Sequence, residues 1–85
     1  MSLRAIVSKP ARKELEDIPL KQRAKLMYAI QAFILTGRGD IETIKPFVGE
    51  YRLRVSEWRV RFSLDAARGE LVVLHILNRR DAYRE

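Results

Sequence analysis

The sequence predicts an α+β fold in which an N-terminal strand and an antiparallel helical hairpin precede a three-stranded antiparallel sheet. Three observations predict it. Apolar side chains recur every three or four positions over residues 20–35, as in an amphipathic helix. Apolar and polar side chains alternate over residues 51–64, as in half-buried strands. Residues 71–77 are apolar on both faces, which is typical of a central strand covered on both sides.

The chain should open with a strand and a helix. Residues 3–8 are expected to form the short first strand. Ser8 is a suitable N-cap and Pro10 is tolerated in a first helical turn, so a helix should run over residues 9–17. Three apolar residues of this segment are spaced to share one face: Ala11, Leu15 and Ile18.

A second helix should begin after Pro19, and Gly37 and Gly39 are the signals that end it. The link between the two helices is short, which favours an antiparallel hairpin. The apolar stripe expected to face the core consists of Leu20, Ala24, Met27, Ile30 and Ile34, widened by Leu26, Ala29 and Phe33.

The rest of the chain joins and follows the strands. Residues 40–50 are expected to be a loop that leads into the sheet. Residues 65–70 form a turn, which explains Asp65 and Glu70 better than a catalytic carboxylate pair does. The tail, residues 78–85, is polar and basic.

Arginines occupy alternate positions on the two runs 51–55 and 58–64: Arg52, Arg54, Arg59 and Arg61. If Ser56 and Glu57 form a tight turn, Arg54 lies across from Arg59, and Arg52 lies across from Arg61. Like charges placed opposite each other cost roughly 0.2–1 kcal/mol per pair, so this face suggests an anionic ligand. The alternative is an ordinary solvated face, in which arginine stems cover apolar surface.

The composition indicates one folded domain, residues 1–85, that favours anionic partners. The chain is 47% hydrophobic and 33% charged, with a net charge of +6. The lack of cysteine excludes disulfides and thiolate sites and fits a reducing cytoplasm, where we expect the protein. We expect no membrane segment, because no apolar run approaches the roughly 20 residues that span a bilayer.

Several guanidinium groups around one pocket suit a phosphodiester, whose oxygens they bind and whose transition state they stabilise. Arginine stays protonated in proteins, so proton transfer needs another group. The nearby candidates for proton transfer are Tyr83, Tyr51, Lys45 and His75. His75 and Tyr51 are expected to be core residues, and Tyr83 is the better candidate of the other two. A single histidine and no cysteine argue against a transition-metal site, and we expect no cofactor.

Four segments together carry a family resemblance: Ile-Lys-Pro-Phe-Val-Gly (44–49), Tyr-Arg-Leu-Arg-Val-Ser-Glu-Trp-Arg-Val-Arg-Phe (51–62), Leu-Val-Val-Leu-His-Ile-Leu (71–77) and Asn-Arg-Arg-Asp-Ala-Tyr-Arg (78–84). In order and spacing they resemble the RelE/ParE superfamily of toxins from type II toxin–antitoxin pairs, in particular its RelE-like branch. The resemblance implies two helices packed on a curved antiparallel sheet with a basic concave face. RelE-like members enter the ribosomal A site and cut the messenger RNA there, by attack of a 2′-hydroxyl on the adjacent phosphate.

The resemblance also implies site residues. Arg52 and Arg54 match the family's basic pair before the turn, and Arg59 matches the basic residue after it. Arg79 or Arg80 matches the arginine after the last long strand, and Tyr83 matches the C-terminal tyrosine. The catalytic set is Arg52, Arg54, Arg59, Arg79, Arg80 and Tyr83. The RNA-binding set is Lys45, Arg61 and Arg84. Some members carry lysine at the basic pair, where this chain has arginine, so the proton path stays open.

The partners implied by the resemblance are a cognate antitoxin protein and the ribosome with bound messenger RNA. Contact with DNA is expected only through the antitoxin complex. Two alternatives stay open: a ParE-like DNA gyrase poison without nuclease activity, and a non-enzymatic basic binding module.

Overall fold

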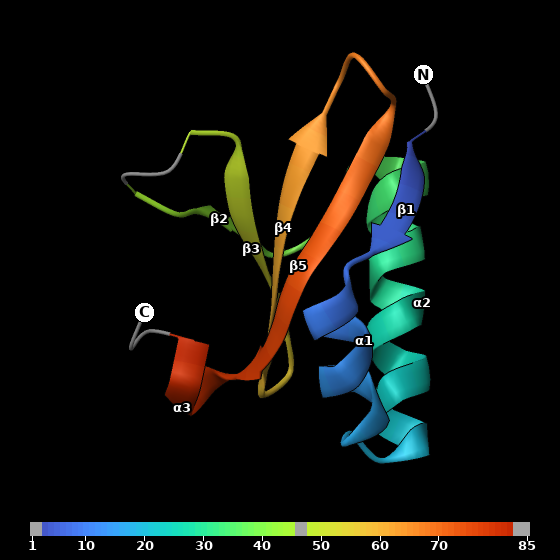
Figure 1. Ribbon diagram of the computed structural model, residues 1–85, viewed down its shortest axis with the longest axis vertical. Coiled ribbons are helices and arrows are strands. Elements are labelled where there is room, and N and C mark those ends of the chain that lie inside the picture. Colours follow the sequence, from blue (N-terminus) through green and yellow to red (C-terminus); the bar gives the residue numbers. More distant parts are fainter. Residues whose placement is uncertain (1–2, 46–47, 83–85) are drawn as a thin grey trace.

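The computed structural model describes residues 3–45 and 48–82, which form one mixed sheet and three helices (Figure 1). The elements are β1 (Arg4–Val7), α1 (Lys9–Glu16), α2 (Leu20–Thr36), β2 (Ile41–Thr43), β3 (Glu50–Val55), β4 (Trp58–Asp65), β5 (Glu70–Asn78) and α3 (Arg79–Ala82). The strands lie in the order β1-β5-β4-β3-β2. β1 runs parallel to β5, and the other neighbouring pairs are antiparallel.

The α+β class, the order of the elements and the helical pair are confirmed, but the sheet has five strands among the described residues instead of three. β1 joins the sheet by pairing with β5, with Ile6 beside Val72. β2 lies within residues 40–50, the segment expected to be a loop. A strand of three residues is too short to show an alternating pattern, so its pairing with β3 decides its conformation.

α1 begins as the sequence predicts. The Ser8 side chain accepts a hydrogen bond from the N–H of Ala11 at 3.3 Å, and Pro10 occupies the first turn, where its missing N–H has no consequence. Beyond the last turn, Nη2 of Arg23 donates to the carbonyl of Ile18 at 3.0 Å. This contact ties the link between the two helices to the first turn of α2.

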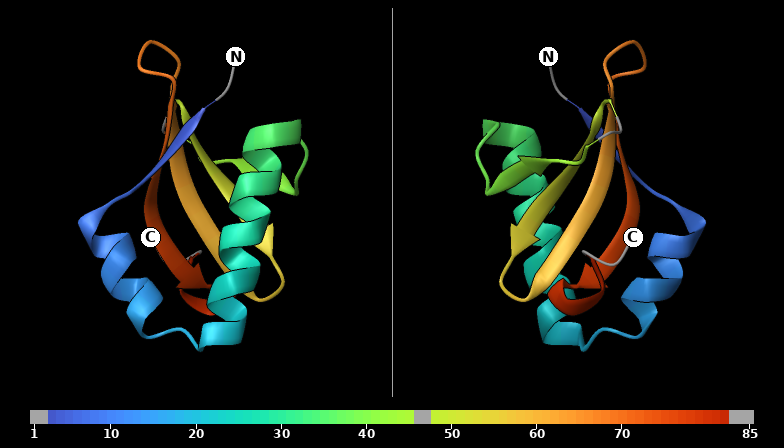
Figure 2. Two further views of the ribbon diagram at one scale, coloured as in Figure 1. Left: turned by 90° about the vertical axis from the view of Figure 1, so that its right-hand side faces the viewer. Right: turned by 90° about the vertical axis from the view of Figure 1, so that its left-hand side faces the viewer.

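α2 follows Pro19 and ends at Gly37, whose φ of 71° lies in the left-handed region that glycine adopts without strain. The predicted apolar stripe is wrong at its N-terminal end, because Leu20 is 74% exposed while Leu26 and Ile30 are buried. Apolar side chains of α2 project on most sides of the helix, so their spacing does not determine which side faces the sheet. In Figure 2 the two helices diverge from their link, and α2 crosses one face of the sheet.

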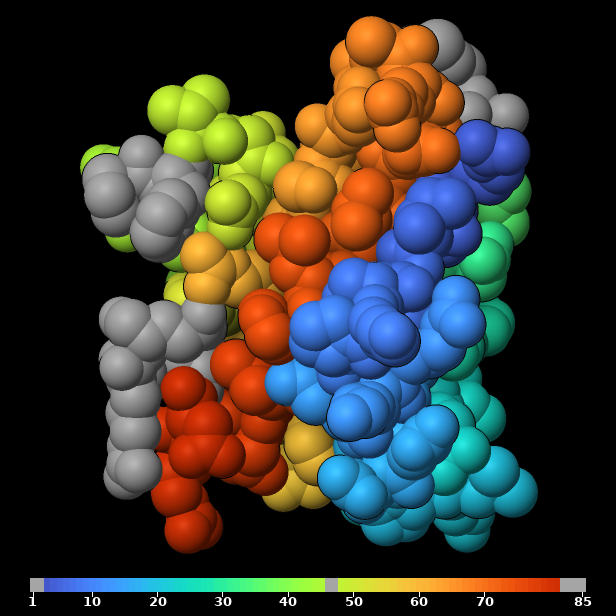
Figure 3. Space-filling model, viewed as in Figure 1, coloured from blue at the N-terminus to red at the C-terminus, as the bar shows by residue number. Residues whose placement is uncertain are grey.

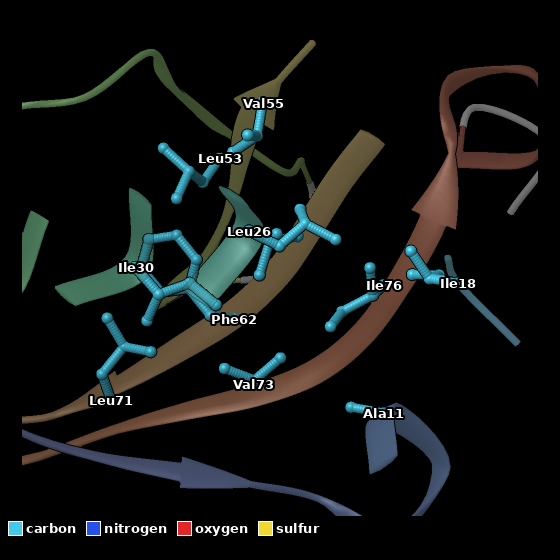
Figure 4. Close-up of a cluster of buried hydrophobic side chains, with 11 residues drawn as sticks. Ala11, Ile18, Leu26, Ile30, Leu53, Val55, Phe62, Leu71, Val73 and Ile76 are labelled. Atoms are coloured by element: carbon cyan, nitrogen blue, oxygen red, sulfur yellow. The ribbon is translucent and has the colours of Figure 1, made fainter. Parts of the chain in front are cut away.

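The core lies between α2 and the sheet (Figure 4). Leu26 and Ile30 meet Val60 and Phe62 of β4, together with residues from β3 and β5. The ring of Phe62 lies 5.5 Å from that of Tyr51 in a stacked arrangement. Tyr51 is therefore on the apolar face, as predicted from the alternation.

Beyond the end of β1, α1 lies along the edge of β5 and makes hydrogen bonds to it. β1 pairs with β5 only as far as Val73, and the N–H of Ser8 then donates to the Val73 carbonyl at 3.0 Å. The Ser8 hydroxyl donates to the Leu74 carbonyl at 2.9 Å, and the N–H of Ile76 donates to Oε1 of Glu14 at 2.8 Å. Figure 3 shows α1 packed directly along β5.

The register of β5 against β4 shifts in its middle. Phe62 pairs with Val73, whereas Arg61 pairs with His75, so Leu74 is an extra residue on β5. Cross-strand partners share a face of the sheet. The bulge therefore places His75 on the same face as Arg61, and Ile76 returns to the core with 2% of its surface exposed.

We predict that Phe62→Ala lowers the free energy of unfolding by about 3–5 kcal/mol, because the ring is 1% exposed and its loss leaves a cavity. Tyr28→Ala is the matched control, since that ring is 77% exposed and its loss should change stability by less than about 0.5 kcal/mol. Urea unfolding followed through the fluorescence of Trp58 measures both changes. Equal losses would contradict the placement of the core.

Candidate functional site

The arginine face comprises Arg52 and Arg54 on β3 and Arg59 and Arg61 on β4. The predicted register is confirmed: Arg54 pairs with Arg59, and Arg52 pairs with Arg61. Ser56 and Glu57 form the two-residue turn between the strands, and Ser56 adopts a φ of 59°. The arginine face is opposite the buried side chains of these strands, so it is turned away from α2 (Figure 2).

Carboxylates from neighbouring strands lie among these arginines. Nη1 of Arg52 is 3.2 Å from Oε1 of Glu42, which lies directly across from it on β2. Nη2 of Arg61 is 2.8 Å from Oε1 of Glu50. The arginine side chains are held at 10% and 15% exposure, so both pairs lie partly out of solvent.

The third ion pair is more open. Nη2 of Arg54 is 2.7 Å from Oδ1 of Asp40, and the two side chains are 42% and 57% exposed. Asp40 precedes β2, and its carbonyl accepts a hydrogen bond from the N–H of Arg54 at 2.8 Å. The repulsion expected between facing arginines is thus offset by Asp40, Glu42 and Glu50, all three from residues 40–50, the segment that the sequence predicts to be a loop.

Arg59 is held by backbone carbonyls of the turn between β3 and β4. Its Nη1 donates to the carbonyls of Ser56 and Trp58, each at 2.9 Å. These two contacts fix the position of the guanidinium. The turn between β3 and β4 thereby positions a cation at the end of the arginine face.

The basic tail reaches the same end of the sheet. Trp58 pairs with Asn78, and the N–H of Arg79 donates to the carbonyl of Glu57 at 2.7 Å. Arg79 and Arg80 are exposed on α3. Among the described residues, Glu57, Asn78, Arg79 and Arg80 line a pocket of about 440 Å³. The structure therefore brings these two predicted site residues next to the turn that holds Arg59.

His75 is not the core residue that the sequence predicts. Its side chain is 41% exposed, and its Nδ1 lies 3.2 Å from Oε2 of Glu14 on α1. It also completes a row of successive cross-strand partners across the arginine face: Glu42, Arg52, Arg61 and His75. The apolar run around His75 gave no signal for this position, because the bulge at Leu74 shifts it from one face to the other.

The other predicted site residues have separate locations. Lys45 is exposed in the connection from β2 to β3. Tyr83 and Arg84 lie outside the described residues. Asp65 and Glu70 flank the turn between β4 and β5, as predicted, and Glu70 pairs with Arg4 at 2.9 Å.

Within residues 3–45 and 48–82, no three histidine, cysteine, aspartate or glutamate side chains are grouped so that they would hold a metal ion. The helices of the same part of the chain all fall short of the length and apolarity required to cross a bilayer.

We predict that Glu42→Gln destabilises the fold more than Asp40→Asn, although each change removes one negative charge. Arg52 is 8% exposed, so weakening its pair with Glu42 should cost about 1–3 kcal/mol. The open pair of Arg54 and Asp40 should be worth only about 0–1 kcal/mol. Thermal and urea unfolding of both variants give the comparison, and a larger loss for Asp40→Asn would refute it.

The chain matches known proteins in three-dimensional structure, but not in sequence. No model of a protein family matches the sequence, and no curated protein matches it. Solved structures do match. RelE toxin from E. coli, solved as a mutant in the free state, superposes with a TM-score of 0.82 at 12% identity, over 98% of this chain and 90% of that one.

Two archaeal structures agree. A RelB–RelE antitoxin–toxin complex from Methanococcus jannaschii matches with a TM-score of 0.76 at 22% identity, over 93% of this chain and 95% of that one. A RelE–RelB complex from Pyrococcus horikoshii OT3 matches with a TM-score of 0.79 at 18% identity, over 96% of this chain and all of that one. The resemblance seen in the sequence thus extends to the backbone, and the chain has the fold of the RelE toxins.

Proposed function

We propose that this protein is the toxin of a toxin–antitoxin pair, and that it cuts messenger RNA in the ribosomal A site. The 2′-hydroxyl of one nucleotide would attack the adjacent phosphate. The observation that carries the proposal is the cluster of four arginines, paired in register on the sheet face that α2 leaves uncovered. The RelE fold supports it, because the proteins that share this fold are toxins.

Charge stabilisation is the chemistry that these arginines offer. A phosphodiester gains negative charge as the 2′-oxygen attacks, and guanidinium groups bind that charge through paired N–H donors. Arg59 is the principal candidate, because two backbone carbonyls at 2.9 Å position its guanidinium at the end of the arginine face, beside Arg79 and Arg80. We propose that the reaction needs no metal ion, since the arginines supply the positive charge that a metal would otherwise provide.

The other arginines suit substrate binding. Glu42 orients Arg52, and Glu50 orients Arg61. The oxygens of a bound phosphate would replace part of the contact that each guanidinium makes with its carboxylate. Arg79 and Arg80 stand next to the turn and would bind the phosphate of a neighbouring nucleotide. Arg54 completes this set on β3.

Three further residues have proposed roles in RNA contact. Lys45 and Arg84 would bind phosphates of the RNA backbone. Tyr83 would stack on a base or position a proton, as the resemblance implies.

The proposed partners are an antitoxin and the translating ribosome. Both archaeal structures described above are complexes of RelE with RelB, which supports an antitoxin for this chain. The antitoxin would present acidic side chains to the arginine face. Contact with DNA would arise only through that complex, and the site of action would be the cytoplasm.

The internal ion pairs of the arginine face are compatible with two alternatives. Arg52, Arg54 and Arg61 each have a carboxylate partner, and such pairs also suit structural cations of a toxin with another target. A ParE-like gyrase poison without nuclease activity would fit that reading. A non-enzymatic basic module would fit it as well.

We predict that Arg59→Ala slows A-site cleavage by roughly 10²–10³-fold, the usual cost of removing one transition-state donor. Primer extension on a defined message in a reconstituted translation mixture measures the cuts. Arg4→Ala is the matched control: Arg4 is an exposed arginine that pairs with Glu70 at the far end of β5, and its loss should leave cleavage unchanged. Failure of the folded wild-type protein to cut any codon would reject the nuclease and lead to a gyrase supercoiling assay.

We also predict that the antitoxin complex withstands salt better than the complex with bare RNA does. RNA affinity depends heavily on counterion release, so it should fall steeply as salt rises. A protein partner adds apolar contacts that salt does not weaken. Titrations of both ligands at several salt concentrations give the two slopes, and equal slopes would count against an antitoxin that buries apolar surface.

A further inference from the structure

We propose that His75 is the general base of the cleavage reaction and that Glu14 positions it. This inference rests on the proposed nuclease function and adds the group that function lacks. Arginine stays protonated in proteins, so the arginine face can bind and stabilise a phosphate but cannot take up the proton of the 2′-hydroxyl. A group that can exchange a proton near neutral pH has to stand beside it.

His75 stands beside it because of the bulge in β5. The register shift at Leu74 makes His75 the direct cross-strand partner of Arg61. Partners of this kind have Cβ atoms roughly 5 Å apart on the same face of a sheet. An imidazole next to Arg61 is therefore within reach of a phosphodiester that this guanidinium binds. The side chain is 41% exposed, so substrate has access to it.

Glu14 holds the ring in the form that a base requires. Oε2 of Glu14 lies 3.2 Å from Nδ1, and Oε1 of the same carboxylate accepts the N–H of Ile76 at 2.8 Å. The backbone bond fixes the carboxylate, and the carboxylate favours a proton on Nδ1. Nε2 is then left with its lone pair, ready to accept a proton. An orienting carboxylate behind a histidine serves the same purpose in hydrolase triads.

Nε2 of His75 takes the proton of the 2′-hydroxyl while that oxygen forms its bond to phosphorus. The bond from phosphorus to the 5′-oxygen of the next nucleotide breaks, and that oxygen takes a proton from water. The products are a 2′,3′-cyclic phosphate and a 5′-hydroxyl. His75 then returns its proton to solvent.

The charged groups around the ring oppose one another. Glu14 on α1 places a negative charge next to the ring, and Arg61, the cross-strand partner of His75 on β4, carries a positive charge. Arg79 and Arg80 on α3 add positive charge beyond the end of β5, and Arg4 on β1 is neutralised by Glu70. The neighbours of His75 on its own strand, Leu74 and Ile76, are apolar.

The experiment compares single-turnover cleavage by wild type, His75→Ala, Glu14→Gln and Glu16→Gln in the reconstituted translation mixture. His75→Ala should be at least about 100-fold slower, and added imidazole should restore part of the rate. Glu14→Gln can keep the Ile76 bond but favours the wrong tautomer, so it should be at least about tenfold slower. Glu16 is an exposed carboxylate on the same helix, so Glu16→Gln should match wild type.

A second readout does not involve cleavage. His75 is the only histidine of the chain, so ¹⁵N-labelled histidine gives a single imidazole spectrum. The neutral ring should carry its proton on Nδ1 in wild type and in Glu16→Gln, and this preference should be lost in Glu14→Gln. Urea unfolding shows whether each variant is folded, and His75→Gln replaces His75→Ala if the alanine variant is not.

The outcomes separate the two proposals. A wild type that cuts, with His75 variants that cut within about threefold of it, would overturn the role of His75 and leave the nuclease standing. A slow His75→Ala that imidazole does not restore would overturn it as well, because a structural role would explain the loss. A folded wild type that cuts nothing would remove the nuclease, and the general base with it. Slow, imidazole-restored cleavage together with the expected tautomers would establish both.

Discussion

β5 pairs with β4 along its whole length but with β1 only as far as Val73, and beyond that point Ser8 and α1 supply the hydrogen bonds that β1 no longer makes. Partly buried backbone groups without partners would cost about 1–3 kcal/mol each, so this edge has to be satisfied. Ser8 and Glu14 satisfy it, and in doing so they fix α1 beside the sheet. The link at Pro19 then directs α2 across the sheet, where Leu26 and Ile30 cover the core. The helical layer is therefore anchored by a few polar contacts at one strand edge.

The bulge at Leu74 lies within the same stretch of β5. It divides the strand into a part that pairs with β1 and a part that pairs with α1. On the far side of the bulge, the face that carries the arginines gains His75, and the core regains Ile76. The contact with Glu14 thus has two consequences, since one carboxylate satisfies a strand edge and orients a side chain at the margin of the arginine face.

Long sequence patterns and clear capping residues predict the strand pairing and the helix ends correctly. The alternation over β3 and β4 predicted which arginines face each other, and Ser8 and Gly37 marked helix ends correctly. Prediction from the sequence failed where the outcome depends on tertiary contacts. β2 is only three residues long, α2 is apolar around most of its circumference, and the bulge that moves His75 has no signature in an apolar run. The roles of Tyr83 and Arg84 stay predictions, because both lie outside the described residues.

β2 and the residue before it contribute little to the core, yet they determine much of the electrostatics of the opposite face. Asp40 and Glu42 belong to a short edge segment, and each faces an arginine of β3. The pair of Asp40 with Arg54 is open, so a substitution at Asp40 should cost little stability. The affinity of the arginine face for anions can therefore change during evolution through this edge alone, while the arginines themselves and the core beneath them stay the same.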